Sequence, residues 1–161
     1  MLPPIQTKPE ASNELEHVFV YGTLKRGQCR EDCWPTTPVS VEVAWTRGRL
    51  FDLGPYPGLL VGSDRVLGEL WSFKADDMPA VLEVLDRVEG TNQAGESNEY
   101  DRVLVAVTRG SHAEVLASTY RYADSSVAQR LEPVRPSTRR SVDGLAYVQW
   151  PNASPVAAPP P

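Results

Sequence analysis

Apolar residues at every second position are the feature that most constrains the fold of this chain. Valine occupies alternate positions in segments 39–43 and 103–107, and segment 115–121 alternates in the same way. A period of two places every second side chain on one face of an extended strand. The centre of the chain therefore predicts several half-buried β-strands.

Three further segments are expected to be extended. Segment 17–21 is apolar and β-rich and predicts a buried first strand, and two other strands are expected over 48–53 and 66–73. The glycines and prolines of segment 54–58 predict a loop. Segment 109–112 predicts a hairpin connection between the last two strands.

One segment has helical spacing instead. Its apolar stripe consists of Val81, Leu82, Leu85 and Val88. Asp76 or Asp77 can cap the start, Pro79 suits the first turn, and Gly90 is expected to end the helix. Glu89 is then the last helical residue or the first one outside.

The prolines divide the chain into a centre and two ends. Ten of the 15 prolines lie before residue 17 or after residue 122. We therefore expect a flexible N-terminal arm over 1–16, a domain over 17–122, and a proline-rich C-terminal extension over 123–161 that is partly ordered at most. Many short strands and one good helix favour a small, barrel-like α+β fold for the domain.

Composition excludes several classes of function. Sixteen basic against 21 acidic residues give a net charge of −5 with no basic cluster, which argues against nucleic-acid binding. The apolar runs are too short to span a bilayer, so no membrane association is expected. Two cysteines and an N-terminus without an apolar core favour a cytoplasmic location.

A loop bounded by Gly22 and Gly27 follows the first expected strand. A phosphate-binding P-loop needs Lys and then Ser or Thr directly after the second glycine, but Gln28 and Cys29 follow here. We therefore exclude binding of nucleoside triphosphates. Two interpretations remain open: a tight turn, or a loop whose backbone N–H groups face a carboxylate or an amide carbonyl.

The cysteines and histidines offer no clear chemistry. Cys29 and Cys33 are four residues apart without a nearby histidine, and two ligands do not make a zinc site. We expect two free thiols and no metal. His17 and His112 are expected to be structural, and no Ser–His or Cys–His pair is placed for nucleophilic catalysis.

Glu89 stands apart from the other carboxylates because it ends the apolar helix. A carboxylate at a buried helix end loses hydration, and the helix C-terminus is partially negative, so both effects raise its pKa toward the range of a general base. The alternative is an exposed glutamate at the end of a helix. The residues alone leave both interpretations open.

Two ordered sequence blocks resemble the signature of the γ-glutamylcyclotransferase-like family, in its AIG2-like or γ-glutamylamine branch. The blocks read VYGTLKRG at 20–27 and LDRVEG at 85–90, followed by YDRV at 100–103. Shorter matches are YPGL at 56–59, GELW at 68–71 and ASTY at 117–120. The resemblance covers about residues 17–122.

This resemblance implies a small mixed β-barrel flanked by helices, with a cavity at one end. It implies that the γ-glutamyl group is bound by Tyr21, Gly22, Thr23 and Leu24. Glu89 is implied as the acid/base group, and Tyr120 as a pocket residue, with Tyr122 as the alternative. No cofactor is implied, and a monomer or a homodimer is expected.

The implied reaction is an intramolecular cyclisation of a small γ-glutamyl substrate. The α-amine attacks the γ-carbonyl and releases 5-oxoproline and an amine or amino acid, with one carboxylate moving the protons. Segments 25–38 and 91–99 and the chain after residue 122 are expected to determine the leaving group. The alternatives are a binding module without turnover and a hydrolase, the latter weakened because no second carboxylate is placed opposite Glu89.

Overall fold

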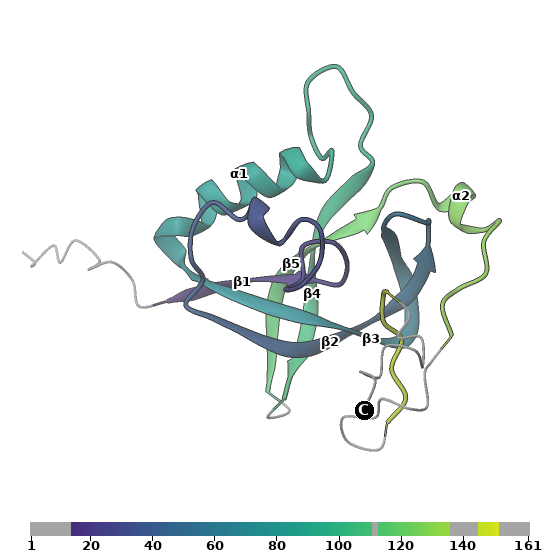
Figure 1. Cartoon of the computed structure of the whole chain (residues 1–161), viewed down its shortest axis with the longest axis horizontal. Coiled ribbons are helices and arrows are strands. Elements are labelled where there is room, and N and C mark those ends of the chain that lie inside the picture. Colours follow the sequence, from purple (N-terminus) through teal and green to yellow (C-terminus); the bar gives the residue numbers. More distant parts are fainter. Residues whose placement is uncertain (1–13, 111–112, 136–144, 152–161) are drawn as a thin grey trace, which may run out of the picture.

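The protein is a closed five-stranded β-barrel with one main helix on its outside (Figure 1). The computed structural model describes residues 14–110, 113–135 and 145–151. The strands are β1 (Leu15–Val20), β2 (Ser40–Asp52), β3 (Pro57–Lys74), β4 (Tyr100–Arg109) and β5 (Glu114–Tyr122). The helices are α1 (Met78–Val88) and the short α2 (Ser125–Ala128), with 3-10 turns at Glu31–Cys33 and Ala75–Asp77.

The strand order around the barrel is β1-β3-β2-β4-β5. Its neighbours pair antiparallel except β1 and β5, which run parallel and place Val18 opposite Ser118. The Thr119 hydroxyl also donates to the Phe19 carbonyl over 2.8 Å across this junction. The expected mixed β-barrel is thus confirmed.

The expectation of separate strands at 39–43 and over 48–53 is wrong. The two form the single strand β2, whose register against β3 shifts between Gly48 and Arg49. A Cβ atom on Gly48 would lie 2.5 Å from the Leu59 Cδ1 atom, so glycine lets Leu59 pack here while the strand bends instead of ending. The expected loop over 54–58 is also shorter, because β3 begins at Pro57.

The second half of strand β1, 18–20, is buried on both faces, which explains its uninterrupted apolar sequence. Phe19 points into the barrel, where the interior core also contains Leu50 and Leu70. Val18 and Val20 face the opposite side and belong to a second core that includes the stripe of α1. A strand covered on both sides has no solvent face to carry polar residues.

The α1 helix follows the predicted spacing, with Val81 and Leu85 buried, and ends at Val88, so Glu89 is the first residue outside. Its predicted start needs a correction. Asp77 occupies the N-cap position, yet its side chain accepts no capping hydrogen bond. The backbone of Asp77 is already helical (φ −86°, ψ −17°), whereas a capping side chain needs an extended backbone to reach the first turn.

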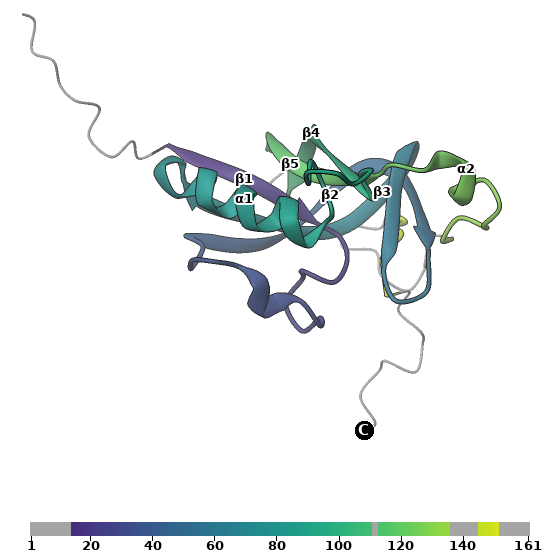
Figure 2. The ribbon, with the colours of Figure 1, turned by 90° about the horizontal axis from the view of Figure 1, so that it is seen from above.

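Two segments beyond β5 pack on the barrel. The interior core includes Val134, Val148 and Trp150. Val148 exchanges backbone hydrogen bonds of 2.8 Å with Arg65 and Leu67 of β3. Figure 2 shows both segments beside the end of the barrel formed by β2 and β3. Part of the expected C-terminal extension is therefore built into the core.

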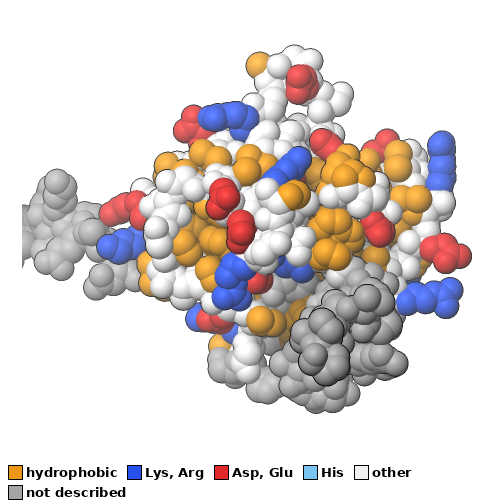
Figure 3. Space-filling view, in the orientation of Figure 1, with side chains coloured by type: hydrophobic (Ala, Val, Ile, Leu, Met, Phe, Trp, Pro, Cys, Tyr) orange, Lys and Arg blue, Asp and Glu red, His pale blue; other side chains and the backbone are white. Residues whose placement is uncertain are grey.

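Other expectations concern residues outside the described ranges: 1–13 of the N-terminal arm, 136–144 and 152–161 of the C-terminal extension, and His112 with part of its hairpin connection. The described part of the chain contains no helix that is long and apolar enough to cross a membrane. On the face shown in Figure 3, basic and acidic side chains are interspersed.

Candidate active site

A cavity of about 200 Å³ opens at the end of the barrel where β1 and β5 end and β3 and β4 begin. It brings together all six residues expected at the site: Tyr21, Gly22, Thr23, Leu24, Glu89 and Tyr120. Tyr122, the alternative to Tyr120, is not among the lining residues; its ring packs edge-on against Tyr100 at 5.4 Å. These six residues come from three separate parts of the chain, so only the closed barrel makes them neighbours.

Tyr21 lies at the inner wall of the cavity, directly after β1. Its hydroxyl donates a short hydrogen bond to the Tyr120 carbonyl and accepts one of 3.2 Å from the Leu59 N–H. Complete burial raises the pKa of Tyr21 well above its ordinary value, and the nearby Glu89 charge adds to this shift. Tyr21 is therefore a neutral residue that joins β1, β3 and β5.

The loop after Tyr21 owes its shape to a close approach at Gly22. A Cβ atom there would lie 2.7 Å from Cγ of Pro57, so only glycine lets the two segments touch. The described residues include no acceptor for the backbone N–H groups of Gly22, Thr23 and Leu24. Three successive donors in the cavity wall are thus available to a bound carbonyl or carboxylate.

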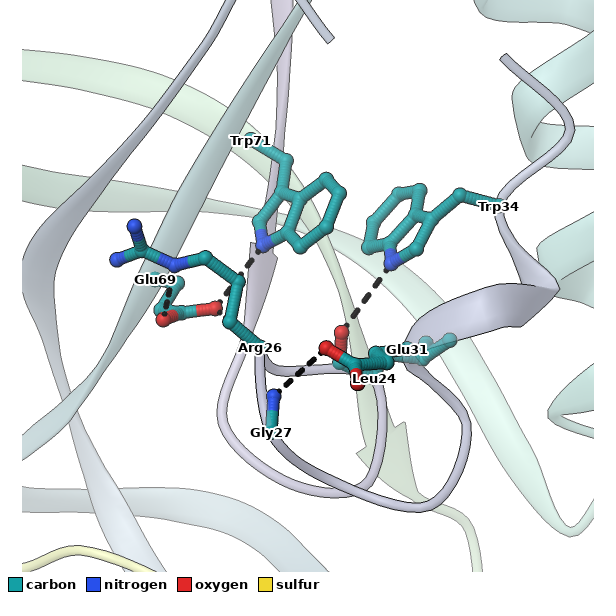
Figure 4. A network of polar contacts seen from close by, with 7 residues as sticks. All are labelled: Leu24, Arg26, Gly27, Glu31, Trp34, Glu69 and Trp71. Carbon is teal, nitrogen blue, oxygen red and sulfur yellow. Dashed lines mark hydrogen bonds and ion pairs between the residues drawn. The ribbon is translucent and has the colours of Figure 1, made fainter. Parts of the chain in front are cut away.

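A polar and aromatic network braces this loop from outside (Figure 4). The Trp34 indole donates to the Leu24 carbonyl over 3.1 Å and stacks on Trp71 at a centroid distance of 4.1 Å. Glu69 accepts bonds of 2.9 Å from the backbone N–H and Nε of Arg26 and one of 3.2 Å from the Trp71 indole. The segment after the loop thus folds back to hold it in place.

Glu89 is held at the C-terminal end of α1, where its N–H donates to the Leu85 carbonyl over 2.8 Å. Burial is the main cause that raises the pKa of Glu89 to about 7, from an ordinary 4.5. The Glu99 charge acts in the same direction, and the Arg30 charge opposes it. Near neutral pH, Glu89 can therefore both accept and donate a proton.

The chain reverses after Glu89 and brings two more residues to the cavity. Gly90 has φ +63°, a left-handed conformation that glycine adopts without strain. The Glu99 N–H then donates to the Gly90 carbonyl over 3.0 Å, and the Thr91 hydroxyl donates to the Tyr100 carbonyl over 2.6 Å. These bonds place Glu99 and Tyr100 beside the end of the helix.

Tyr120 connects the barrel to the helix that carries Glu89. Its hydroxyl donates to Asp86 Oδ1 over 2.7 Å, and Asp86 Oδ2 pairs with Arg102 at 3.4 Å. Burial raises the pKa of Tyr120, and its hydrogen bond to Asp86 adds to the shift. Tyr120 therefore stays neutral and fixes α1 relative to β5.

The cavity is also lined by four polar residues that the sequence did not predict there: Arg30, Tyr56, Glu99 and Tyr100. Both tyrosines lie in blocks that resemble the family, and this was the available signal. Arg30 and Glu99 lie within two of the segments expected to determine the leaving group. A hydrogen bond to Glu99 is the main cause that raises the pKa of Tyr56 to about 12.

The structure does contain a Ser–His pair, but away from the cavity. His17 Nδ1 lies 2.7 Å from the Ser72 hydroxyl, and Ser72 has no solvent exposure. A hydroxyl without access to solvent cannot attack a substrate, so this pair has a structural role between β1 and β3. The described ranges hold no cluster of three His, Cys, Asp or Glu residues suited to a metal, and Cys29 and Cys33 are free thiols.

Comparisons with known proteins agree with this architecture. The family model described as gamma-glutamyl cyclotransferase, AIG2-like, matches residues 18–148. An AIG2-like protein from Mus musculus has the same fold, with 22% identity, a TM-score of 0.59, and coverage of 83% of this chain and 95% of that one. A protein from Arabidopsis thaliana is 28% identical over 70% of this chain and 72% of its own, with a TM-score of 0.53. A comparison with curated proteins finds no match.

Proposed function

The chain belongs to the gamma-glutamyl cyclotransferase, AIG2-like family, and we propose that it cyclises a small γ-glutamyl compound. In this reaction the α-amine forms a C–N bond with the γ-carbonyl carbon, and the original amide C–N bond breaks. The products are 5-oxoproline and an amine or amino acid. The observation that carries the proposal is Glu89, a carboxyl with a pKa of about 7 in the same cavity as the Gly22–Leu24 loop.

Glu89 is the proposed proton shuttle. As the carboxylate, it takes a proton from the attacking amine; as the acid, it returns that proton to the departing nitrogen. One group can perform both steps because its pKa lies close to neutral pH. The protons balance within the substrate, so the reaction needs no metal or organic cofactor.

The loop supplies the proposed electrostatic stabilisation. Negative charge develops on the γ-oxygen when the amine attacks, and backbone N–H groups in a site of low water content stabilise it most effectively. Gly22, Thr23 and Leu24 have such N–H groups without acceptors among the described residues. Tyr21 and Tyr120 are the proposed walls that hold the γ-glutamyl chain in its folded shape.

The small cavity suits an intramolecular reaction. A volume of about 200 Å³ leaves little room for an extended substrate. Holding the amine near the carbonyl replaces a bimolecular encounter, and such orientation supplies a large share of the acceleration in ring closures. The barrel is thus proposed to act mainly by confining the substrate.

Replacing Glu89 with the isosteric glutamine tests this function. Glu89→Gln cannot accept the proton, so release of 5-oxoproline should fall by about 10²–10⁴-fold in kcat. Glu83→Gln is the matched control, because Glu83 lies on the same helix, with 75% of its side chain exposed. Full activity of the Glu89 variant on a panel of γ-glutamyl compounds would contradict the proposed role.

One observation supports a second candidate, an Asp/Glu-type hydrolase. Glu99 is a second carboxylate in the cavity, which a mechanism with two carboxylates requires. Product identity separates the candidates, because hydrolysis releases glutamate and cyclisation releases 5-oxoproline. Saturable binding of a γ-glutamyl compound without either product would instead indicate a binding module.

A further inference from the structure

We propose that Arg30 is a specificity residue that binds a carboxylate on the leaving group. The protein would then prefer γ-glutamyl compounds that release an α-amino acid over those that release a simple amine. This inference rests on the proposed cyclisation and deepens it.

Arg30 is the one lysine or arginine among the described residues that line the cavity. Its position is held by the main chain, since its N–H donates to the Thr23 carbonyl over 2.9 Å. Thr23 belongs to the loop proposed to bind the γ-glutamyl group. The backbone of Arg30 is therefore tied to the same loop as the reacting end of the substrate.

Arg30 also differs from the arginines that stabilise the fold. Four arginines have carboxylate partners within 4 Å: Arg26, Arg87, Arg102 and Arg109. In the described part of the chain, the Arg30 side chain has neither an ion pair nor a hydrogen bond. An unpaired guanidinium at a cavity is suited to receive a carboxylate from a ligand.

Neither of the two carboxylates that line the cavity, Glu89 and Glu99, neutralises Arg30 by an ion pair within 4 Å. Glu99 already interacts with the Tyr56 hydroxyl. The Arg30 charge acts to lower the pKa of Glu89, but no ion pair within 4 Å joins the two side chains among the described residues. The guanidinium thus keeps its donors free while it lies close enough to act on the reacting centre.

The burial of the lining residues indicates which part of the substrate meets Arg30. We define the cavity floor as Tyr21, Leu24, Tyr100 and Tyr120, all buried, and the cavity rim as Arg30, Tyr56 and Glu99, which are partly or fully exposed. The floor suits the γ-glutamyl chain, so the leaving group extends toward the rim. In an α-amino acid, the carboxylate is only two bonds from the departing nitrogen.

The test compares three substrates that share one γ-glutamyl group: γ-glutamyl-alanine, its C-terminal carboxamide, and γ-glutamyl-ethylamine. The wild-type protein should have a higher kcat/KM for the acid than for the other two. Arg30→Gln should lower kcat/KM for the acid by about 10–100-fold more than for the two uncharged leaving groups, as expected for the loss of a charge-assisted hydrogen bond. Arg30→Lys should restore part of the preference.

The controls separate recognition from general effects. Arg49→Gln makes the same change at an exposed arginine of β2 that does not line the cavity, and it should leave the preference unchanged. Loss of the Arg30 charge also shifts the pKa of Glu89, but this affects all three substrates equally. The ratio of acid to carboxamide is therefore the decisive readout, with thermal melting as the check on folding.

Two outcomes would overturn the inference. An equal fall for all three substrates in Arg30→Gln would show that the guanidinium acts on the shared γ-glutamyl group or on Glu89 and not on the leaving group. A wild-type ratio near one would show that no leaving-group carboxylate is recognised.

Failure of the proposed function gives a different result. If the wild-type protein releases no 5-oxoproline from any substrate, calorimetric titration with γ-glutamyl-alanine and its carboxamide replaces the kinetic comparison. Tighter binding of the acid that is lost in Arg30→Gln would support the carboxylate site without the activity. Equal binding of the two compounds would reject the site as well.

Discussion

The floor and the rim of the cavity are built on different principles. The four floor residues are at most 6% exposed, and their three hydroxyl groups all donate to groups of the protein. The rim residues come from three irregular segments, and the Arg30 guanidinium has no partner in the described part of the chain. The hydroxyl groups of the floor are all hydrogen-bonded within the protein, whereas the rim leaves the Arg30 guanidinium available to a ligand.

This difference separates two tasks that any γ-glutamyl cyclisation must combine. A floor held by packing and internal hydrogen bonds keeps its geometry, which is what orientation of a shared γ-glutamyl group requires. A rim on loops tolerates changes in sequence without loss of the barrel. Changes to the floor should therefore affect every substrate, and changes to the rim should alter selectivity or pH dependence.

Among changes to the walls around Glu89, the largest effect is expected beside the floor, at Gly22. Gly22→Ala places a Cβ atom 2.7 Å from Pro57 Cγ, so the loop must move away. A displacement of positioned groups by about 1 Å costs about 100-fold in rate, and we expect at least this fall in 5-oxoproline release for all substrates. Gly110→Ala is the control, because a Cβ atom at Gly110 would meet nothing within 4 Å. Unchanged activity in Gly22→Ala would remove the loop from the site.

The next effect concerns stability, because the raised pKa of Glu89 opposes folding at high pH. The folded state retains a proton between pH 4.5 and about 7 that the unfolded state loses, so stability falls across this range. Glu89→Gln should raise the free energy of unfolding at pH 8 by roughly 1–3 kcal/mol and change it little at pH 4. Urea unfolding at both pH values checks this. An equal change at both would show that charge burial is not the cause.

A smaller loss of stability is expected at Tyr120. Tyr120→Phe removes the hydroxyl that donates to Asp86 and thereby connects β5 to α1. The free energy of unfolding should fall by about 1–2 kcal/mol, since the bond involves a charged acceptor. Tyr122→Phe, the matched change on the same strand, should cost less than about 0.5 kcal/mol. Equal losses in urea titrations would contradict the distinction between the two tyrosines.

The smallest effect is expected at the rim, from Glu99. Its negative charge raises the pKa of Glu89, so Glu99→Gln should lower that pKa. The acidic limb of the kcat/KM profile should then move to lower pH by less than about one unit. Glu96→Gln, in the same loop but not in the cavity lining, should leave the profile in place. A shift of the acidic limb to higher pH would contradict the inference that the Glu99 charge raises the pKa of Glu89.

Part of this architecture was predictable from local pattern. Alternating valines identified β4, and the 81–88 stripe identified α1 with Glu89 directly after it. Short-range periodicity reports which face of an element is buried, and no distant residue is needed to detect it. The resemblance to the family then drew attention to Tyr21 and Tyr120.

Other features could not be predicted in this way. The continuity of β2 depends on Leu59 filling the space beside Gly48, and the Asp77 cap failed because a 3-10 turn precedes the helix. Trp150 belongs to the barrel core although it lies in the C-terminal extension that was expected to be partly ordered at most. Each of these features depends on contacts between residues that are distant in sequence or on the exact backbone path.

By itself, the sequence determined where most of the extended segments lie, the main helix and a candidate acid/base residue, because these follow from spacing and residue type. Only the tertiary structure decided that Glu89 is half-buried with a raised pKa, that Gly22 lies against Pro57, and that Arg30 and Glu99 share its cavity. A pKa depends on every charge and every atom that excludes water around a group. Closure of the barrel brings those neighbours together, and no local sequence pattern encodes that closure.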